Sequence, residues 1–300
     1  MRIGIDLGGT KTEGIVMDNA NQILIRARRP TPSHDYEAVL NTVRDLVVSL
    51  EQQAGERCRV GIGLPGALST RSGNLKNANT TCLNGKPVRS DLENRLNRKI
   101  RLSNDANCFA LSEAIDGSGL GYPVVFGVIM GTGVGGGIVF NGQVHEGPQS
   151  IAGEWGHNVL EPGGPLCYCG KRGCVETLIS GPGLTRDYQA AGGDTRLDAK
   201  AIVTRAETGD EIAAAAMQRF LDRFGRALAM VINILDPHAV ILGGGLSNIT
   251  RLYSEGRARI AEYVFNDELL TPVLPNKFGD SSGVRGAAQL WGADENGVVM

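Results

Sequence analysis

Two stretches of the sequence, residues 2–29 and 124–144, share one order of strand, glycine-rich turn and returning strand. In the first stretch, residues 2–7, 12–18 and 22–29 are β-branched and apolar runs separated by Gly-Gly and Asn turns, which is typical of a three-stranded meander. In the second stretch, VVFGVIM, GTGVGGG and GIVFNGQV follow one another along the chain. This repetition predicts two related α/β domains, and the cleft between two such domains is a common ligand site.

Helical patterns follow each repeat. From Tyr36, valine and leucine recur at helical spacing, and Ser33 is placed to cap that helix. A second long helix is expected over about Glu211 to Leu235, ahead of the strand HAVILGGG. The predicted domains are residues 1–118, completed by a C-terminal helix at about 284–300, and residues 119–283, with a boundary near Gly117 to Gly121.

Charge and composition exclude several classes of protein. The 300 residues carry a net charge of −2 and an isoelectric point near 6.1, so neither nucleic acid nor an anionic membrane surface is an expected partner. The uncharged stretch from Gly117 to His145 contains GTGVGGG, which makes a poor membrane helix. Asp6 interrupts the N-terminal region where a signal peptide needs an apolar run, so a cytoplasmic location is expected.

Three glycine turns are candidates for binding a nucleotide. DLGGTKTE at residues 6–13 lacks the spacing of a P-loop, and GTGVGG at 131–136 precedes a strand where the dinucleotide fingerprint needs a helix. Such turns can still bind phosphate, because bare backbone N–H groups converge on an anion; the alternative is a plain tight hairpin turn. Asp6 beside the first turn could hold Mg²⁺, and LGGG at 242–245 suits a flat adenine ring.

The segment CYCGKRGC, residues 167–174, holds three of the six cysteines of the chain. A cytoplasmic protein keeps its thiols reduced. Cysteines at this spacing therefore favour a metal site over a disulfide.

Six motifs together resemble the ROK family of repressors, open reading frames and kinases. They are IDLGGTKTE, GIGLPG, NDANCFALSEA, GTGVGGG, GEWGH and CYCGKRGCVE, and they are spread over nearly the whole chain. That family belongs to the actin-like, hexokinase-like ATPases with a ribonuclease H-like fold. The resemblance therefore implies an α/β protein of two related domains with an interdomain cleft.

The resemblance also implies a structural zinc site in the second domain. The family motif, Glu-x-Gly-His before Cys-x-Cys-Gly-x-x-Gly-Cys-x-Glu, is present without a departure. The implied ligands are His157, Cys167, Cys169 and Cys174. Four protein ligands leave no open position, so this zinc would fix a loop rather than act on substrate; the alternative is three thiols in a loop and a surface histidine. Zinc would hold Glu154 and Glu176 at the two ends of the loop, where both can accept hydrogen bonds from sugar hydroxyls.

The resemblance assigns the catalytic base to Asp105. This residue follows an apolar strand and precedes a helix expected from about Asn107 to Ile115, and the alternative is that Asp105 only caps that helix. The implied sugar contacts are Gly66, Asn79, Asn104, Glu154, His157 and Glu176. The implied contacts to ATP and Mg²⁺ are Asp6, Gly8, Gly9, Thr10, Lys11, Gly131, Thr132, Gly133, Gly135, Gly243, Gly244 and Gly245. For Lys11 the alternative is a solvated surface lysine.

These features predict an ATP-dependent kinase for the 6-hydroxyl of a free hexose. The segment NANTTCLNGKP and the GEWGHN context are most similar to the fructokinase and mannokinase branch, so D-fructose and D-mannose are the expected substrates. NDANCFALSEA is equally similar to N-acetylglucosamine kinases, which makes that activity, or glucokinase activity, the alternative. A sugar-responsive repressor is the alternative of another class, but no basic recognition helix precedes the meander that begins at Arg2. Homodimers are common among such kinases, so a homodimer is expected.

Overall fold

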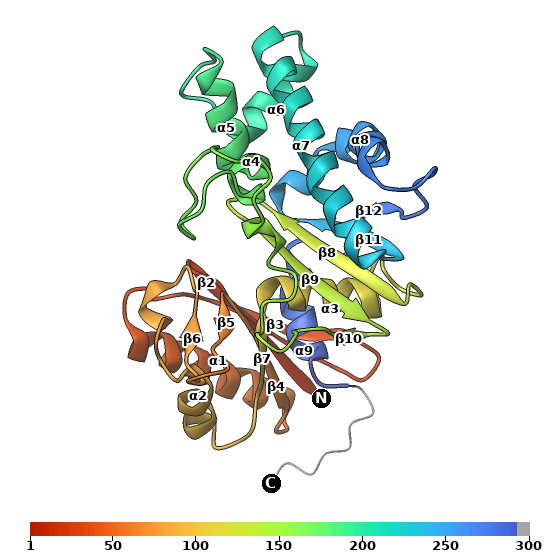
Figure 1. Ribbon diagram of the computed structural model, residues 1–300. Coiled ribbons are helices and arrows are strands. Elements are labelled where there is room, and N and C mark those ends of the chain that lie inside the picture. Colours follow the sequence, from red (N-terminus) through yellow and green to blue (C-terminus); the bar gives the residue numbers. More distant parts are fainter. Residues whose placement is uncertain (293–300) are drawn as a thin grey trace. The chain divides into compact units, whose positions relative to one another are not determined.

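Two five-stranded sheets of equivalent order form the framework of the computed structural model, which describes residues 1–292 (Figure 1). The first sheet has the order β3 (Ile23–Pro30), β2 (Lys11–Met17), β1 (Arg2–Leu7), β4 (Arg59–Leu64) and β7 (Arg101–Asn104). The second has the order β10 (Gln143–Val144), β9 (Val134–Phe140), β8 (Val124–Met130), β11 (Ala239–Gly243) and β12 (Val273–Pro275). In each sheet the last three strands run parallel to one another. The shared order confirms the duplication that the sequence predicts.

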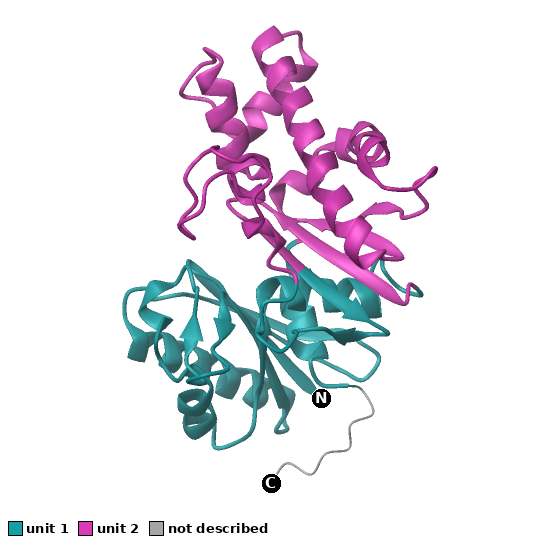
Figure 2. Ribbon diagram, in the orientation of Figure 1, with its two compact units in different colours: residues 1–121, 137–152, 280–300 teal, residues 122–136, 153–279 magenta. Residues whose placement is uncertain are grey.

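The chain divides into two compact units (Figure 2). The first contains residues 1–121, 137–152 and, of the described residues, 280–292; the second contains residues 122–136 and 153–279. The predicted domains 1–118 and 119–283 stay a prediction, and the units differ from them by placing 137–152 in the first unit. The expected C-terminal helix corresponds to α9 (Ser282–Gln289) in that unit, while residues 293–300 lie outside the described part of the chain.

The first unit also contains three other helices and a small hairpin. These are α1 (Tyr36–Ala54), α2 (Val88–Leu96), α3 (Asp105–Ile115), the 3₁₀ turn η1 (Thr81–Leu83), and the strands β5 (Ala67–Leu68) and β6 (Leu75–Lys76). Every apolar position at helical spacing in α1 is buried, as predicted. The predicted cap at Ser33 is wrong: Asp35 caps α1 by accepting a hydrogen bond from the N–H of Ala38 at 3.1 Å. Asp35 stands in the position from which its side chain reaches the third residue of the helix.

Helix α9 packs against β1, β4 and α3 of its own unit. A Cβ on Gly61 of β4 would collide with the carbonyl oxygen of Ala287, and a Cβ on Gly286 would collide with the carbonyl oxygen of Cys108 in α3. The side chain of Ser282 donates a hydrogen bond of 2.7 Å to the fully buried Glu113 of α3. These backbone-to-backbone contacts fix α3, and with it the residue at its N-terminus, against the first sheet.

The second unit carries the remaining helices. They are α4 (Val175–Ile179), α5 (Gly181–Ala190), α6 (Ala199–Glu207), α7 (Glu211–Leu235), α8 (Glu255–Tyr263), and the 3₁₀ turns η2 (Trp155–His157), η3 (Gly245–Asn248), η4 (Thr250–Leu252) and η5 (Gly279–Ser281), of which η5 lies at the boundary with the first unit. The bounds of α7 agree with the predicted helix, and Asp210 caps it by accepting from the N–H of Ala213 at 2.9 Å. Among residues 1–292, no helix has the length and apolar character needed to cross a membrane.

The packing of α9 predicts that Gly61→Ala destabilises the protein by roughly 3 kcal/mol, because the added methyl group meets backbone that cannot rotate away. The measurement is the free energy of unfolding in denaturant. Gly245→Ala is the matched control, since a Cβ there meets no atom within 4 Å. Equal stability of the two variants would contradict the proposed role of this contact.

Candidate functional site

The N-terminal glycine turn places Asp6 among other charges of the first unit. Asp6 lies in β1 opposite Glu13 of β2, and the N–H of Gly8 donates to the carbonyl of Lys11 at 3.0 Å to close the turn. Burial, followed by the negative charges of Asp105 and Glu13, raises the pKa of Asp6 to about 7, against a smaller lowering by Lys11. A cation at this turn would favour the ionised carboxylate, so the surroundings of Asp6 fit the predicted Mg²⁺ contact.

The predicted base is the first residue of helix α3. The N-cap is Asn104, whose Oδ1 accepts from the N–H of Ala106 at 2.8 Å, and Oδ1 of Asp105 accepts from the same N–H at 2.8 Å. The helix therefore begins two residues before the expected start at Asn107, because Asn104 satisfies its first free donor. A carboxylate in the first turn is stabilised as the anion by the helix N-terminus.

Two of the predicted sugar contacts lie together beside this helix. The Nδ2 group of Asn104 donates to the carbonyl oxygen of Gly66 at 3.2 Å, and both residues line a pocket of about 310 Å³ within the first unit. Gly66 adopts a φ of 79°, a left-handed conformation that favours glycine. Asn79 is exposed and is not part of the pocket lining.

The second glycine turn, in the second unit, holds the side chain of Glu176. Its Oε2 accepts from the backbone N–H of Val134 at 3.0 Å, and a Cβ on Gly133 would lie 2.6 Å from the same oxygen. The turn is closed by a hydrogen bond of 2.9 Å from the N–H of Gly131 to the carbonyl of Gly133. Thr132 at its tip is exposed. A larger side chain at position 133 would displace this carboxylate.

The third glycine turn follows β11. Gly243 is the last residue of the strand. Gly244 has a φ of 78° and lies close to the carbonyl group of Met130. A Cβ on Gly244 would collide with that carbonyl oxygen. The short 3₁₀ turn η3 begins at Gly245, and the next α-helix, α8, begins at Glu255. The Ser247 side chain donates to the carbonyl of Gly244 at 2.7 Å, which stabilises the tight turn.

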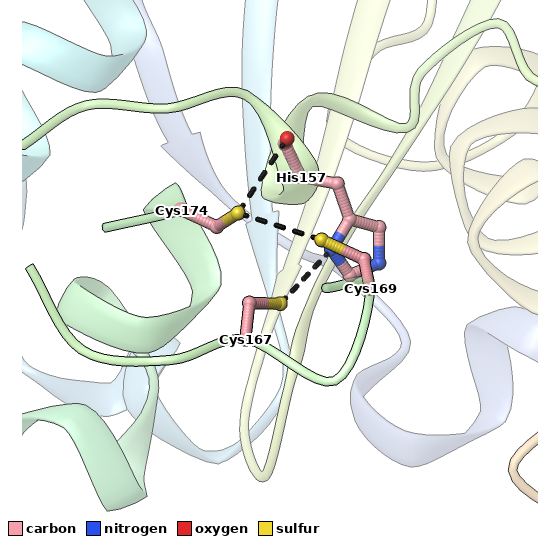
Figure 3. Close-up of side chains that lie close together, drawn as sticks. All are labelled: His157, Cys167, Cys169 and Cys174. Carbon is pink, nitrogen blue, oxygen red and sulfur yellow. Dashed lines mark hydrogen bonds between the residues drawn. The ribbon is translucent and has the colours of Figure 1, made fainter. Parts of the chain in front are cut away.

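The four predicted zinc ligands converge in the second unit (Figure 3). Their ligand atoms all lie within 4.8 Å of one another. Sγ of Cys167 is 3.5 Å from Nδ1 of His157, and Sγ of Cys169 is 3.6 Å from Sγ of Cys174. Zinc–sulfur bonds of about 2.3 Å in a tetrahedron place the sulfur atoms roughly 3.7 Å apart, so both the donor set and its spacing fit Zn²⁺.

The backbone of the zinc loop is held by glycine and by helix α7. A Cβ on Gly173, whose φ is 69°, would collide with the carbonyl oxygen of Glu161. The carboxylate of Glu161 accepts from Arg223 at 2.9 Å and from Arg226 at 2.7 Å, both on α7. The loop is thus fixed at its base by ion pairs and, with metal bound, at its tip by the four ligands.

His157 presents its two ring nitrogens to different partners. Nδ1 faces the cysteine cluster, while Nε2 lies 2.9 Å from the hydroxyl of Tyr168, which is 75% exposed. Glu154 precedes η2, and its carbonyl accepts from the N–H of His157 at 3.3 Å. The predicted zinc and sugar roles of His157 can therefore use separate nitrogens.

The predicted residues fall into two groups, one in each unit. The first group contains Asp6, Gly8, Gly9, Thr10, Lys11, Gly66, Asn79, Asn104 and Asp105. The second contains Gly131, Thr132, Gly133, Gly135, Glu154, His157, Glu176, Gly243, Gly244, Gly245 and the three cysteines. Two further residues have no part in the sequence-based prediction: Tyr168, beside His157, and Asn107, which lines the pocket of the first unit. Asn107 belongs to the NDAN segment, but its position in that segment does not distinguish it from an ordinary helix residue.

Comparison with known proteins identifies the family of the chain. The ROK family model matches residues 2–294, so the chain belongs to the ROK family. An N-acetyl-D-glucosamine kinase from Citrobacter koseri is 42% identical over 300 residues, which cover 97% of this chain and 99% of the relative.

Two solved structures are similar over nearly their whole length. The ROK hexokinase from Thermus thermophilus is 32% identical with a TM-score of 0.84 and 96% of each chain covered. A ROK family glucokinase from Streptomyces griseus, in complex with glucose and AMPPNP, is 28% identical with a TM-score of 0.80, covering 96% of this chain and 98% of the other. The protein has the two-domain actin-like, hexokinase-like ATPase fold that the motifs imply.

The raised pKa of Asp6 predicts how stability changes with pH. Between the ordinary carboxyl pKa near 4 and the folded value of about 7, the folded state binds more protons than the unfolded state, so stability falls as pH rises through this range. Asp6→Asn removes this dependence and should stabilise the metal-free protein at pH 8 by roughly 2 to 4 kcal/mol. Thermal unfolding of both proteins from pH 4 to pH 8 measures the effect, and parallel curves would contradict it.

The cysteine cluster predicts about one zinc ion per chain in protein purified without added metal, as measured by elemental analysis. Cys169→Ser should release zinc and lower the melting temperature, since the loop loses a ligand. Cys82→Ser is the control, because Cys82 is partly buried and lies outside the cluster. Folded protein that is stable and free of zinc would refute a structural metal.

Proposed function

We propose that the protein is an ATP-dependent N-acetyl-D-glucosamine kinase that phosphorylates the 6-hydroxyl of the free sugar. The observation that carries the proposal is the full-length identity of 42% with a relative of that name. It favours the alternative named from NDANCFALSEA over the expected fructokinase or mannokinase. The position of Asp105 at the N-terminus of α3, next to Asn104, supports the kinase chemistry.

Asp105 is the proposed general base. Its carboxylate takes the proton of the attacking hydroxyl while that oxygen bonds to the γ-phosphorus, and the bond from phosphorus to the bridging oxygen breaks to release ADP. The carboxylate stands in the first turn of α3, where the helix N-terminus favours negative charge. Because phosphoryl transfer demands little covalent chemistry of the protein, most of the catalysis comes from positioning the hydroxyl and stabilising charge.

Three side chains are proposed to bind the sugar. Asn104 is oriented by its two hydrogen bonds, to Ala106 and Gly66. Oε2 of Glu176 accepts from the turn, and Oε1 is assigned to a sugar hydroxyl. The Nε2 atom of His157 is assigned to another hydroxyl, which takes the place of the Tyr168 hydroxyl.

The three glycine turns are proposed to bind ATP. Gly133 lies against the carboxylate of Glu176 and Gly244 against the carbonyl of Met130. Main-chain N–H groups of the turns are the proposed partners for phosphate oxygens and the base. Asp6 would contact Mg²⁺, which when bound neutralises charge on the phosphates. The relative crystallised with glucose and AMPPNP supports this assignment of ligands.

The proposed substrate is tested by steady-state rates on N-acetyl-D-glucosamine, D-glucose, D-mannose and D-fructose, with ATP and Mg²⁺. We expect kcat/KM to be highest for N-acetyl-D-glucosamine. A higher value for fructose or mannose would restore the original expectation, and ATP turnover without any sugar would argue against a hexose kinase.

The proposed base is tested with Asp105→Asn, which keeps the shape of the side chain but cannot take the proton. We expect kcat to fall by roughly 10² to 10⁴ while the dissociation constants of ATP and sugar change much less. Asp198→Asn is the matched control, since Asp198 caps α6 and asparagine caps about equally well. Near-normal phosphoryl transfer by Asp105→Asn in a rapid-quench experiment would overturn the mechanism.

A further inference from the structure

Tyr168 lies in the zinc loop between two of the proposed ligands, Cys167 and Cys169, and it is 75% exposed. Its hydroxyl is 2.9 Å from Nε2 of His157, and its ring meets the imidazole edge-on, with the ring centroids 5.0 Å apart and an interplanar angle of 88°. Within residues 1–292 the Tyr168 side chain makes no other hydrogen bond or ring contact. The phenol ring can therefore turn away from His157 without disturbing a packed core.

The His157 ring has a single proton with which to meet a partner. Nδ1 faces the cysteine cluster, 3.5 Å from Sγ of Cys167, and the other ring nitrogen points away from the sulfur atoms (Figure 3). A histidine that ligates zinc through Nδ1 is neutral and carries its ring proton on Nε2, from which it donates to a neighbouring acceptor. In this structure the acceptor at that place is the hydroxyl oxygen of Tyr168.

The hydroxyl of Tyr168 also lies within the electrostatic influence of two proposed sugar contacts. The side chain as a whole is largely exposed, but burial around the hydroxyl, followed by the negative charges of Glu176 and Glu154, raises the pKa of Tyr168 to about 12. The phenol is thus neutral at physiological pH, and a neutral hydroxyl can donate and accept hydrogen bonds as a sugar hydroxyl does. Tyr168 therefore presents to His157 the same kind of group that a sugar would present.

We propose that Tyr168 competes with the sugar for the Nε2 proton of His157 and that this residue sets the sugar affinity of the site. The inference rests on the proposed function and deepens it. One N–H group makes one well-aligned hydrogen bond, so the sugar hydroxyl and the Tyr168 hydroxyl exclude each other at Nε2. The apparent sugar affinity is reduced by the fraction of molecules in which Tyr168 occupies that position.

The direction of the effect distinguishes competition from a supporting role. A side chain that supports the loop, or that contacts the bound sugar, weakens sugar binding when it is removed. Removal of an internal competitor strengthens binding, because the sugar no longer has to break the bond between Tyr168 and His157. The net stability of one hydrogen bond within a protein, measured against the bond to water that replaces it, corresponds to a factor of roughly two to ten in affinity.

The test is Tyr168→Phe, which keeps the ring and removes the hydroxyl. Calorimetric titration of the full-length, zinc-loaded protein uses the sugar with the highest kcat/KM among the four hexoses named above. We expect the dissociation constant of this sugar to fall roughly two- to tenfold, with zinc content measured to show that the loop is intact. Tyr263→Phe is the matched control: Tyr263 is also exposed, its hydroxyl donates to Asp222 outside the zinc loop, and this variant should bind the sugar as the natural protein does.

A second measurement observes the displacement directly in the natural protein. Fluorine NMR of protein labelled with 3-fluorotyrosine gives one signal for each tyrosine, and the signal of Tyr168 is the one that disappears in Tyr168→Phe. We expect saturating sugar to shift this signal, since the phenol ring leaves the imidazole. Tyr168→Ala, which removes the ring as well, should also tighten sugar binding and serves for both measurements if Tyr168→Phe does not fold.

The outcomes separate this inference from the proposed function. Sugar affinity that is unchanged or weaker without the Tyr168 hydroxyl overturns the competition, as does a Tyr168 signal that saturating sugar leaves in place, and both results leave the proposed kinase intact. A natural protein that prefers another hexose refutes the proposed substrate alone, because the titration uses whichever sugar is preferred. A protein that binds none of the four sugars refutes the proposed function and the inference together.

Discussion

The close approach of α9 to the first sheet is the contact on which the geometry of the first unit depends. Carbonyl oxygens of α9 and α3 lie where a Cβ of Gly61 or Gly286 would stand, so helix and sheet meet backbone to backbone. Asp6 on β1 and Asp105 on α3 are carried by elements that α9 contacts, and after burial the negative charge of Asp105 contributes most to the raised pKa of Asp6. Their separation is therefore set by packing that tolerates almost no adjustment.

The zinc loop of the second unit has few apolar side chains. Its conformation therefore depends on interactions other than hydrophobic packing. Two arginines of α7 hold Glu161 at the base of the loop, and His157 and the cysteines converge at its tip. Polar contacts there, together with the proposed zinc ion, would take the place of a hydrophobic core. The result is a short segment between η2 and α4 whose two ends, at Glu154 and Glu176, depend on the same cluster.

Local pattern predicted the helices α1 and α7 and the meander of the first sheet, since long apolar periodicity needs no distant partner. Convergence of His157 with three cysteines was also predictable, because the motif specifies its ligands. The strand β12 and the helices α5 and α6 were missed because they are short. The hydrogen bonds of Asn107 were not predictable for another reason: its side-chain amide donates to Ser103, whose hydroxyl donates to Glu146, 43 residues further along the chain. Contacts of that kind exist only after folding.

The hydrogen bond between the glycine turn and Glu176 has a thermodynamic consequence. One carboxylate oxygen accepts from the N–H of Val134, so the side chain proposed to meet the sugar is bonded to the turn proposed to meet phosphate. A ligand that orders either partner lowers the cost of ordering the other. Linkage makes this effect reciprocal: whatever factor the sugar adds to nucleotide affinity, the nucleotide must add to sugar affinity. Synergy between two substrates can thus arise from a single hydrogen bond within one unit.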